Sequence, residues 1–162
     1  MEIGAFLTSH GITFDRFDHK AVFTCEESKD LPPMPGIRTK NLFLRDKNGK
    51  RAILVVVGDD KAVDLKALKA VIGSDKLSFA SPERLKELLG VEPGSVTLLG
   101  LVHDTEHAVE VFLDRPVWEA DCLQCHPLVN TATVILQHAG TEAFLAATGH
   151  EARVIDVPKR QM

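Results

Sequence analysis

Three short segments of this chain carry side chains that could do chemistry. The first is Cys122-Leu123-Gln124-Cys125-His126, where two thiols and an imidazole lie close along the sequence. This spacing is typical of covalent haem attachment. It also supplies three of the four ligands that a structural zinc ion requires, and His103 or His107 would have to complete the set. A metalloprotein is therefore one hypothesis, beside the simpler interpretation of two reduced cysteines on a loop.

In the other two segments, polar side chains lie where a loop leads into a predicted strand. Residues 36–45 lead Lys40 and Asn41 into a strand directly after a loop rich in proline and glycine. Residues 126–133 form a loop with one histidine, one asparagine and two threonines that leads into an apolar strand. Loops held by a scaffold often carry functional groups. Taken alone, each segment is equally explained as a solvated hairpin or a capped turn.

Other common chemistries lack their signatures in this chain. There is no G-x-S-x-G, no Walker loop and no G-x-G-x-x-G, which removes the usual support for a serine nucleophile or a nucleotide site. Tyrosine is absent and there is one tryptophan, so a base-stacking sheet has little to stack with. The net charge is −4, whereas proteins that hold long nucleic acids by bulk charge are usually basic. Any contact with nucleic acid must therefore be local.

The elements that would position these groups alternate between helices and strands. Asn48-Gly49 between two apolar runs predicts a hairpin, and Ser81-Pro82 predicts a helix start. Thr24 and Glu27 fit a capping box. The expected strands are 12–17, 40–45, 51–57, 77–79, 96–101, 108–113, 132–136 and 153–157, and the expected helices are 2–9, 64–71, 82–90 and 141–149.

This pattern predicts a mixed α/β fold with a largely antiparallel sheet and surrounding helices. The 162 residues are enough for one domain, and we expect residues 1–162 to form it. No apolar run approaches the ~20 residues of a membrane span. The N-terminus lacks the basic start of a signal peptide. We therefore expect a cytoplasmic protein that does not bind membranes.

Several segments, taken together and in chain order, resemble a known family. They are Lys40-Asn41-Leu42-Phe43-Leu44, Leu77 to Glu83, Gly90 to Thr97, Asp104-Thr105-Glu106 and His126 to Thr133. In this order they are similar to the superfamily of YbaK and prolyl-tRNA synthetase editing domains. The similarity is greatest to its free-standing, trans-editing branch, ProXp-ala or PrdX, and it extends over essentially the whole chain.

The resemblance implies an aminoacyl-tRNA deacylase that needs no cofactor and no metal. Its catalytic residues would be Lys40, Asn41 and His126. Lys40 would contact the phosphate or ribose of the terminal nucleotide, Asn41 would neighbour the pocket, and His126 would be a pocket wall or a general base. The substrate-binding residues would be Thr131, Ala132 and Thr133 at the amino acid, with Arg45 and Lys47 at phosphates.

The implied substrate is the acceptor end of tRNA(Pro) carrying a wrong amino acid. Alanine is the first expectation, because a small pocket admits it and excludes proline. Serine, 2-aminobutyrate and cysteine are alternatives, and a non-catalytic module that binds aminoacyl-tRNA is another. Prolyl-tRNA synthetase is a candidate partner, and the chain would be a monomer or a weak dimer. Each of these hypotheses requires Lys40 and His126 to face each other across a methyl-sized cavity.

Overall fold

A mixed sheet of eight strands organises the chain. The computed structural model describes residues 2–21 and 33–160. The strand order is β1-β7-β6-β2-β3-β5-β8, and the short β4 pairs with β2. Four of the seven pairings are antiparallel, and the pairs β2–β6, β3–β5 and β5–β8 are parallel. The strands are β1 (Phe14–Asp18), β2 (Ile37–Arg45), β3 (Ala52–Gly58), β4 (Ser78–Phe79), β5 (Val109–Asp114), β6 (Cys122–Cys125), β7 (Ala132–Gln137) and β8 (Ala152–Ile155).

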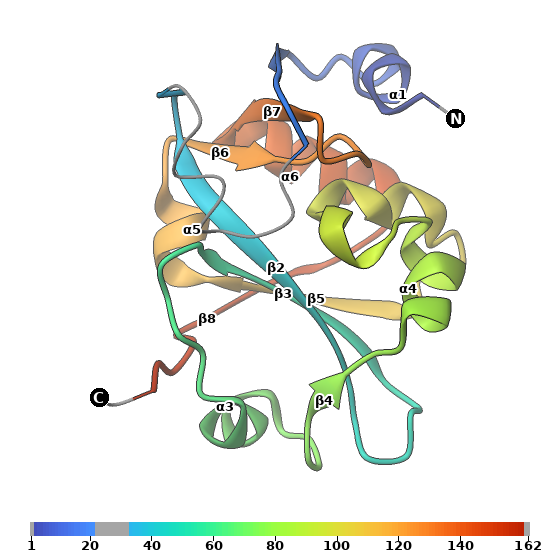
Figure 1. The fold of residues 1–162 in the computed structure, drawn as a ribbon, viewed down its shortest axis with the longest axis vertical. Coiled ribbons are helices and arrows are strands. Elements are labelled where there is room, and N and C mark those ends of the chain that lie inside the picture. Colours follow the sequence, from blue (N-terminus) through green and yellow to red (C-terminus); the bar gives the residue numbers. More distant parts are fainter. Residues whose placement is uncertain (1, 22–32, 161–162) are drawn as a thin grey trace.

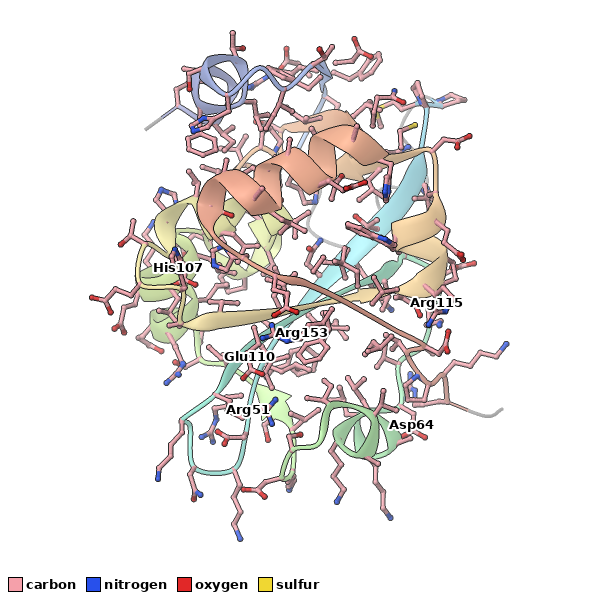
Figure 2. The ribbon with its side chains drawn as sticks, turned by 180° about the vertical axis from the view of Figure 1, so that it is seen from behind. Arg51, Asp64, His107, Glu110, Arg115 and Arg153 are labelled. Atoms are coloured by element: carbon pink, nitrogen blue, oxygen red, sulfur yellow. The ribbon has the colours of Figure 1, made fainter. Side chains whose placement is uncertain are left out.

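Within residues 2–21 and 33–160, five α-helices and two 3₁₀ helices accompany the sheet. They are α1 (Ile3–Ser9), α3 (Leu65–Ile72), α4 (Pro82–Leu89), α5 (Arg115–Glu119), α6 (His138–Thr148), η1 (Pro93–Ser95) and η2 (Leu98–His103). Helix α6 covers one face of β6 and β7, behind the sheet in Figure 1 and in front of it in Figure 2. Among the described residues, no helix is both long and apolar enough to cross a membrane.

The predicted hairpin and helix ends are confirmed. Strands β2 and β3 pair from Thr39↔Gly58 to Arg45↔Ala52. In the turn between them Gly49 has a φ of 69°, where a side chain would be strained. The buried Asp46 carboxylate accepts hydrogen bonds from the N–H groups of Lys50 and Arg51. Helices α3 and α4 begin after the predicted caps Asp64 and Ser81.

Three predictions from the sequence need correction, and one helix was missed. The apolar run 96–101, predicted as a strand, is mostly the 3₁₀ helix η2, because the Thr97 hydroxyl accepts from the N–H of Leu99 and starts a helical turn. The cysteines lie on strand β6 rather than on a loop. Helix α5 was not predicted. Helix α6 begins at His138 instead of Thr141, whose buried hydroxyl donates to the Gln137 carbonyl within the helix. The capping box predicted at Thr24 and Glu27 lies outside the described residues.

The sheet separates two apolar clusters. The larger is formed with α1, α4, η2 and α6, and the smaller lies on the other side of β2 and β3, against α3. Strand β3 is buried from Ala52 to Val57 and contributes alternately to both. In β2, Phe43 belongs to the larger cluster and Leu44 to the smaller. This alternation fixes the face of the sheet on which each residue of β2 lies.

Candidate functional site

Strands β2 and β6 bring two distant polar segments together. They pair in parallel through Ile37↔Leu123 and Arg38↔Gln124. The Thr39 hydroxyl donates a 2.8 Å hydrogen bond to the Gln124 carbonyl and extends this contact. Continued by two residues beyond Arg38↔Gln124, the same register would set Lys40 level with His126. Because neighbouring strands lie about 4.8 Å apart, the strand that carries the lysine passes beside the turn that carries the histidine.

Glycine at position 36 allows β2 to enter beside β6. Gly36 has a φ of 93°, and a Cβ atom there would lie 3.0 Å from the carbonyl oxygen of Cys122. Only glycine tolerates both the left-handed conformation and this close approach. The side chain of Gln124 faces the same loop and donates to the carbonyl of Met34 at 3.1 Å. The loop rich in proline and glycine therefore aligns β2 for its pairing with β6.

Alternation along the strands puts Lys40 and Thr133 on the same face of the sheet. Lys40 is opposite Val57, a member of the smaller cluster, so its side chain leaves β2 on the face away from α6. In β7, Val134 belongs to the larger cluster, which places Thr133 on that same outer face. Thr133 is buried, with 5% of its surface exposed. Among the ion pairs between described residues, none involves Lys40.

Asn41 lies on the other face of β2. It is opposite Val56 of the larger cluster, and its Oδ1 is buried without a hydrogen-bond partner among the described residues. The structure therefore separates Asn41 from Lys40 across the sheet. A role for Asn41 beside the amino acid stays a prediction, and an unpartnered buried oxygen of this kind is open to a further hydrogen bond.

His126 sits at the start of the turn between β6 and β7. Its carbonyl accepts a 2.7 Å hydrogen bond from the Thr97 hydroxyl, and its Nδ1 is buried without a partner in the described part of the chain. Burial lowers the pKa of His126, and this effect outweighs a backbone hydrogen bond with Ala132 that raises it. The imidazole is therefore neutral at pH 7 and can accept a proton or orient a water molecule.

His19 is a member of the site that sequence reasoning missed. Its Nε2 lies 2.8 Å from Oγ1 of Thr133, and its N–H donates to the Thr131 carbonyl at 2.9 Å. The side chain of Thr131 is exposed, whereas Ala132, opposite Asp18 of β1, is fully buried. The position of His19 directly after a predicted strand was the available signal, but nothing in the sequence tied that strand to β7.

Arg45 and Lys47 lie at the other end of β2. Arg45 is five residues beyond Lys40, about 17 Å along an extended strand. It lines a hollow of about 490 Å³ with Phe79 and Arg84, and Lys47 is exposed in the hairpin turn. In Figure 1 this turn lies at the opposite end of the molecule from β6 and β7. Glu83 and Glu87 line the same hollow, and a role for Arg45 and Lys47 at phosphates stays a prediction.

Two other cations have partners within the fold, Arg51 beside the hairpin and Arg38 at the far end of β2. Arg51 forms two 2.8 Å hydrogen bonds with the Glu110 carboxylate, and the two side chains lie together in Figure 2. Arg38 pairs with Asp59 at 3.0 Å. Both arginines are engaged in holding neighbouring strands and turns together. Neither arginine therefore adds to the two cations Arg45 and Lys47.

The two cysteines of the C-x-x-C-H motif point away from each other. Leu123 and Cys125 both belong to the larger cluster, so Cys122 lies on the opposite face of β6. Burial raises the pKa of Cys125 to about 12, which keeps it a thiol. Among the residues that the structure describes, no three His, Cys, Asp or Glu side chains are grouped to hold a metal ion. The geometry of β6 therefore gives the zinc and haem hypotheses no support.

Comparison with known proteins identifies the family. The model described as "Aminoacyl-tRNA editing domain" matches residues 19–144. The chain is 38% identical over 148 residues to the prolyl-tRNA editing protein ProX of Acetoanaerobium sticklandii, which covers 90% of each chain. It is 37% identical over 152 residues to prolyl-tRNA synthetase associated domain-containing protein 1 of Danio rerio, covering 92% of this chain and 82% of that one.

A solved structure supports the same fold. The crystal structure of a proposed trans-editing enzyme for prolyl tRNA synthetase superposes with a TM-score of 0.73 at 23% identity, over 99% of this chain and 96% of that one. The resemblance drawn from the sequence and the expected mixed α/β fold are both confirmed. The chain belongs to the aminoacyl-tRNA editing domain family and is a hydrolase of the ester bond between an amino acid and tRNA.

Proposed function

We propose that this protein removes a small, wrongly attached amino acid from tRNA(Pro), with alanine as the preferred one. The names of the two relatives, which refer to prolyl-tRNA editing and to prolyl-tRNA synthetase, support the choice of tRNA. The observation that carries the site assignment is the parallel pairing of β2 with β6, whose register brings Lys40 beside the His126 turn. A methyl-sized cavity between them stays a prediction.

The reaction asks for positioning more than for a strong nucleophile. An aminoacyl ester is already activated, so a water molecule held near its carbonyl carbon is enough to attack it. The Lys40 ammonium would hold the phosphate or ribose of the terminal nucleotide and stabilise the charge that develops on the carbonyl oxygen. The neutral imidazole of His126 would form a wall of the pocket or orient that water.

Selection of the amino acid would follow from size. A pocket that fits a methyl group admits alanine and excludes the proline ring, which is the second sieve of an editing system. Serine, 2-aminobutyrate and cysteine each have one non-hydrogen atom more than alanine and are the alternative substrates. Association with prolyl-tRNA synthetase and a monomeric or weakly dimeric state remain predictions.

A deacylation panel tests the proposal. Purified protein is mixed with tRNA(Pro) charged with alanine, serine, 2-aminobutyrate, cysteine or proline, and loss of each ester is timed. We expect alanine to be released fastest and prolyl-tRNA(Pro) to stay intact. Lys40→Ala should lower kcat/KM about 100-fold or more, the scale seen when a group that stabilises transition-state charge is removed.

Lys159→Ala is the matched control, because Lys159 is an exposed lysine in the C-terminal segment. Its rate should equal that of the unmodified protein. Equal activity of the Lys40 and Lys159 variants would overturn the site assignment. Hydrolysis of prolyl-tRNA(Pro) as fast as alanyl-tRNA(Pro) would overturn the proposed selectivity, and no hydrolysis of any charged tRNA(Pro) would overturn the choice of substrate.

A further inference from the structure

The turn that carries His126 is conformationally demanding. It connects β6 to β7 through residues 126–131, and Leu128 within it has a φ of 71°. A non-glycine residue with a positive φ costs of order 1 kcal/mol or more, and it persists only where the surrounding structure holds it. The contacts that fix the two ends of this turn therefore decide where the His126 imidazole lies.

Each end of the turn has its own anchor. At the first end, the buried Thr97 hydroxyl donates to the His126 carbonyl at 2.7 Å. At the second end, His19 makes two contacts: its N–H donates to the Thr131 carbonyl at 2.9 Å, and its ring nitrogen Nε2 lies 2.8 Å from Oγ1 of Thr133. His19 follows β1, whose pairing with β7 runs from Phe14↔Leu136 to Asp18↔Ala132.

The hydrogen bonds of His19 define its tautomer. Its Nδ1 lies 2.8 Å from the Lys20 carbonyl oxygen, which can only accept, so Nδ1 carries the hydrogen. In the neutral ring Nε2 has no hydrogen and accepts from the Thr133 hydroxyl. A doubly protonated ring would lose this acceptor. The neutral imidazole thus links the backbone after β1 to the first residues of β7.

We propose that His19 is a positioning residue for the deacylation, which acts through Thr133 and the Thr131 carbonyl to hold the His126 turn in its reactive geometry. The inference rests on the proposed function. His19 touches neither the ester nor the attacking water in this scheme. Its removal should therefore reduce kcat and leave KM nearly unchanged, because a displacement of about 1 Å at a reacting group can cost about 100-fold in rate.

A matched pair of amide variants separates positioning from general damage. In His19→Gln the amide oxygen reaches about as far as Nε2 and can accept from Thr133. In His19→Asn the shorter amide replaces Nδ1 alone. We expect His19→Ala, His19→Asn and Thr133→Val to lower kcat by 10- to 100-fold on alanyl-tRNA(Pro), and His19→Gln to restore most of it. The double variant His19→Ala/Thr133→Val should be no slower than either single variant, since both lose the same hydrogen bond.

Hydrogen exchange of residues 126–133 gives a second measurement that does not depend on catalysis. Faster amide exchange in this segment is expected for His19→Asn and Thr133→Val, with His19→Gln close to the unmodified protein. If His19→Ala fails to fold, the comparison of His19→Gln with His19→Asn still tests the positioning role. Normal kcat in His19→Asn and Thr133→Val overturns the inference while the proposed function stands. If the unmodified protein is inactive, the proposed function fails. In that case, amide exchange of residues 126–133 that is the same in the variants and in the unmodified protein would overturn the positioning role as well.

Discussion

At the residue scale, His126 is the group whose protonation the proposed chemistry depends on. Burial lowers the pKa of His126 below its ordinary value of 6.5, although a backbone hydrogen bond with Ala132 offsets part of this shift. The neutral form therefore persists as pH falls through 6.5 and is lost only below the lowered pKa. We expect kcat/KM for deacylation to be flat from about pH 7.5 to 6.5 and to fall at lower pH.

The measurement is a pH profile of single-turnover deacylation between about pH 4.5 and 7.5, corrected for spontaneous hydrolysis of the ester. His126→Gln is the comparison, because glutamine has no titration in this range. Its profile should be lower and should lack the acidic limb. An acidic limb of the same midpoint in His126→Gln would assign the titration to another group.

Cys125 shows how burial sets reactivity at a single residue. The thiol is 5% exposed and its pKa is raised to about 12 by burial, so almost none of it is thiolate at pH 8. We expect iodoacetamide to leave Cys125 unmodified in the folded protein and to modify it once urea has unfolded the chain. Mass spectrometry of the peptide that contains Cys125 measures this. Modification of the folded protein at the unfolded rate would contradict the buried position.

At the element scale, local signals in the sequence predicted much of the fold. Asn48-Gly49, the caps Asp64 and Ser81, and the helix-ending glycines Gly73 and Gly90 each fix a backbone conformation through their own chemistry. Such signals do not need the rest of the chain. The hairpin and two helices could therefore be predicted to within about three residues.

The elements that were missed depend on contacts between distant segments. Strand β6 has only four residues, and it is extended because β2 and β7 flank it. The run 96–101 is apolar enough for a strand, but Thr97 starts a 3₁₀ turn that is buried on all sides. For the same reason Lys40 and His126 were identified through resemblance, whereas His19 required the pairing of β1 with β7.

A buried carboxylate joins three elements at the end of η2. Asp104 accepts from the N–H groups of Ala108 and Val109 before β5, and from His150 after α6 at 2.8 Å. Burial raises the pKa of Asp104, but these hydrogen bonds outweigh it, so the net pKa lies below the ordinary 3.8. In the structure Asp104 is 4% exposed and fixes the approach of α6 to β5.

Asp104→Asn should therefore destabilise the protein by about 2 kcal/mol at pH 7, because buried donors lose their charged acceptor. A lowered folded-state pKa gives stability that is present above the unfolded pKa and is lost as pH falls through the folded one. The difference between the two proteins should be constant from about pH 7 to 5 and shrink below about 3.8. Urea unfolding measures it, with Glu106→Gln, exposed in the same turn, as control. If the difference in free energy of unfolding between the two proteins stayed constant down to pH 2, the stabilising role assigned to the Asp104 carboxylate would be wrong.

At the scale of the whole molecule, a net negative charge coexists with two cations at one end, and we expect any contact with RNA to be local. The net charge is −4, yet Arg45 and Lys47 lie at the end of the molecule formed by the hairpin and β4. Phe79, 61% exposed, lies beside Arg45 in the same hollow. The unpaired 3′ end of a tRNA, about four nucleotides stacked roughly 3.4 Å apart, spans about 14 Å. Lys40 and Arg45 are separated by a similar distance along β2, although their odd separation of five positions puts their side chains on opposite faces of the strand.

Arg45→Ala/Lys47→Ala should therefore weaken binding of the acceptor stem and leave the chemistry intact. We expect a KM for alanyl-tRNA(Pro) raised several-fold, an unchanged kcat, and a slope of log affinity against log salt reduced by roughly 1 per cation removed. On a short alanylated CCA fragment, which lacks the stem, the variant and the unmodified protein should behave alike. Lys159→Ala should change neither slope nor KM. An equal loss of activity on the fragment and on the full tRNA would place Arg45 and Lys47 at the ester instead of at the stem. Each phosphate that a cation neutralises must release counterions. An unchanged salt slope would therefore show that the two residues do not contact the tRNA.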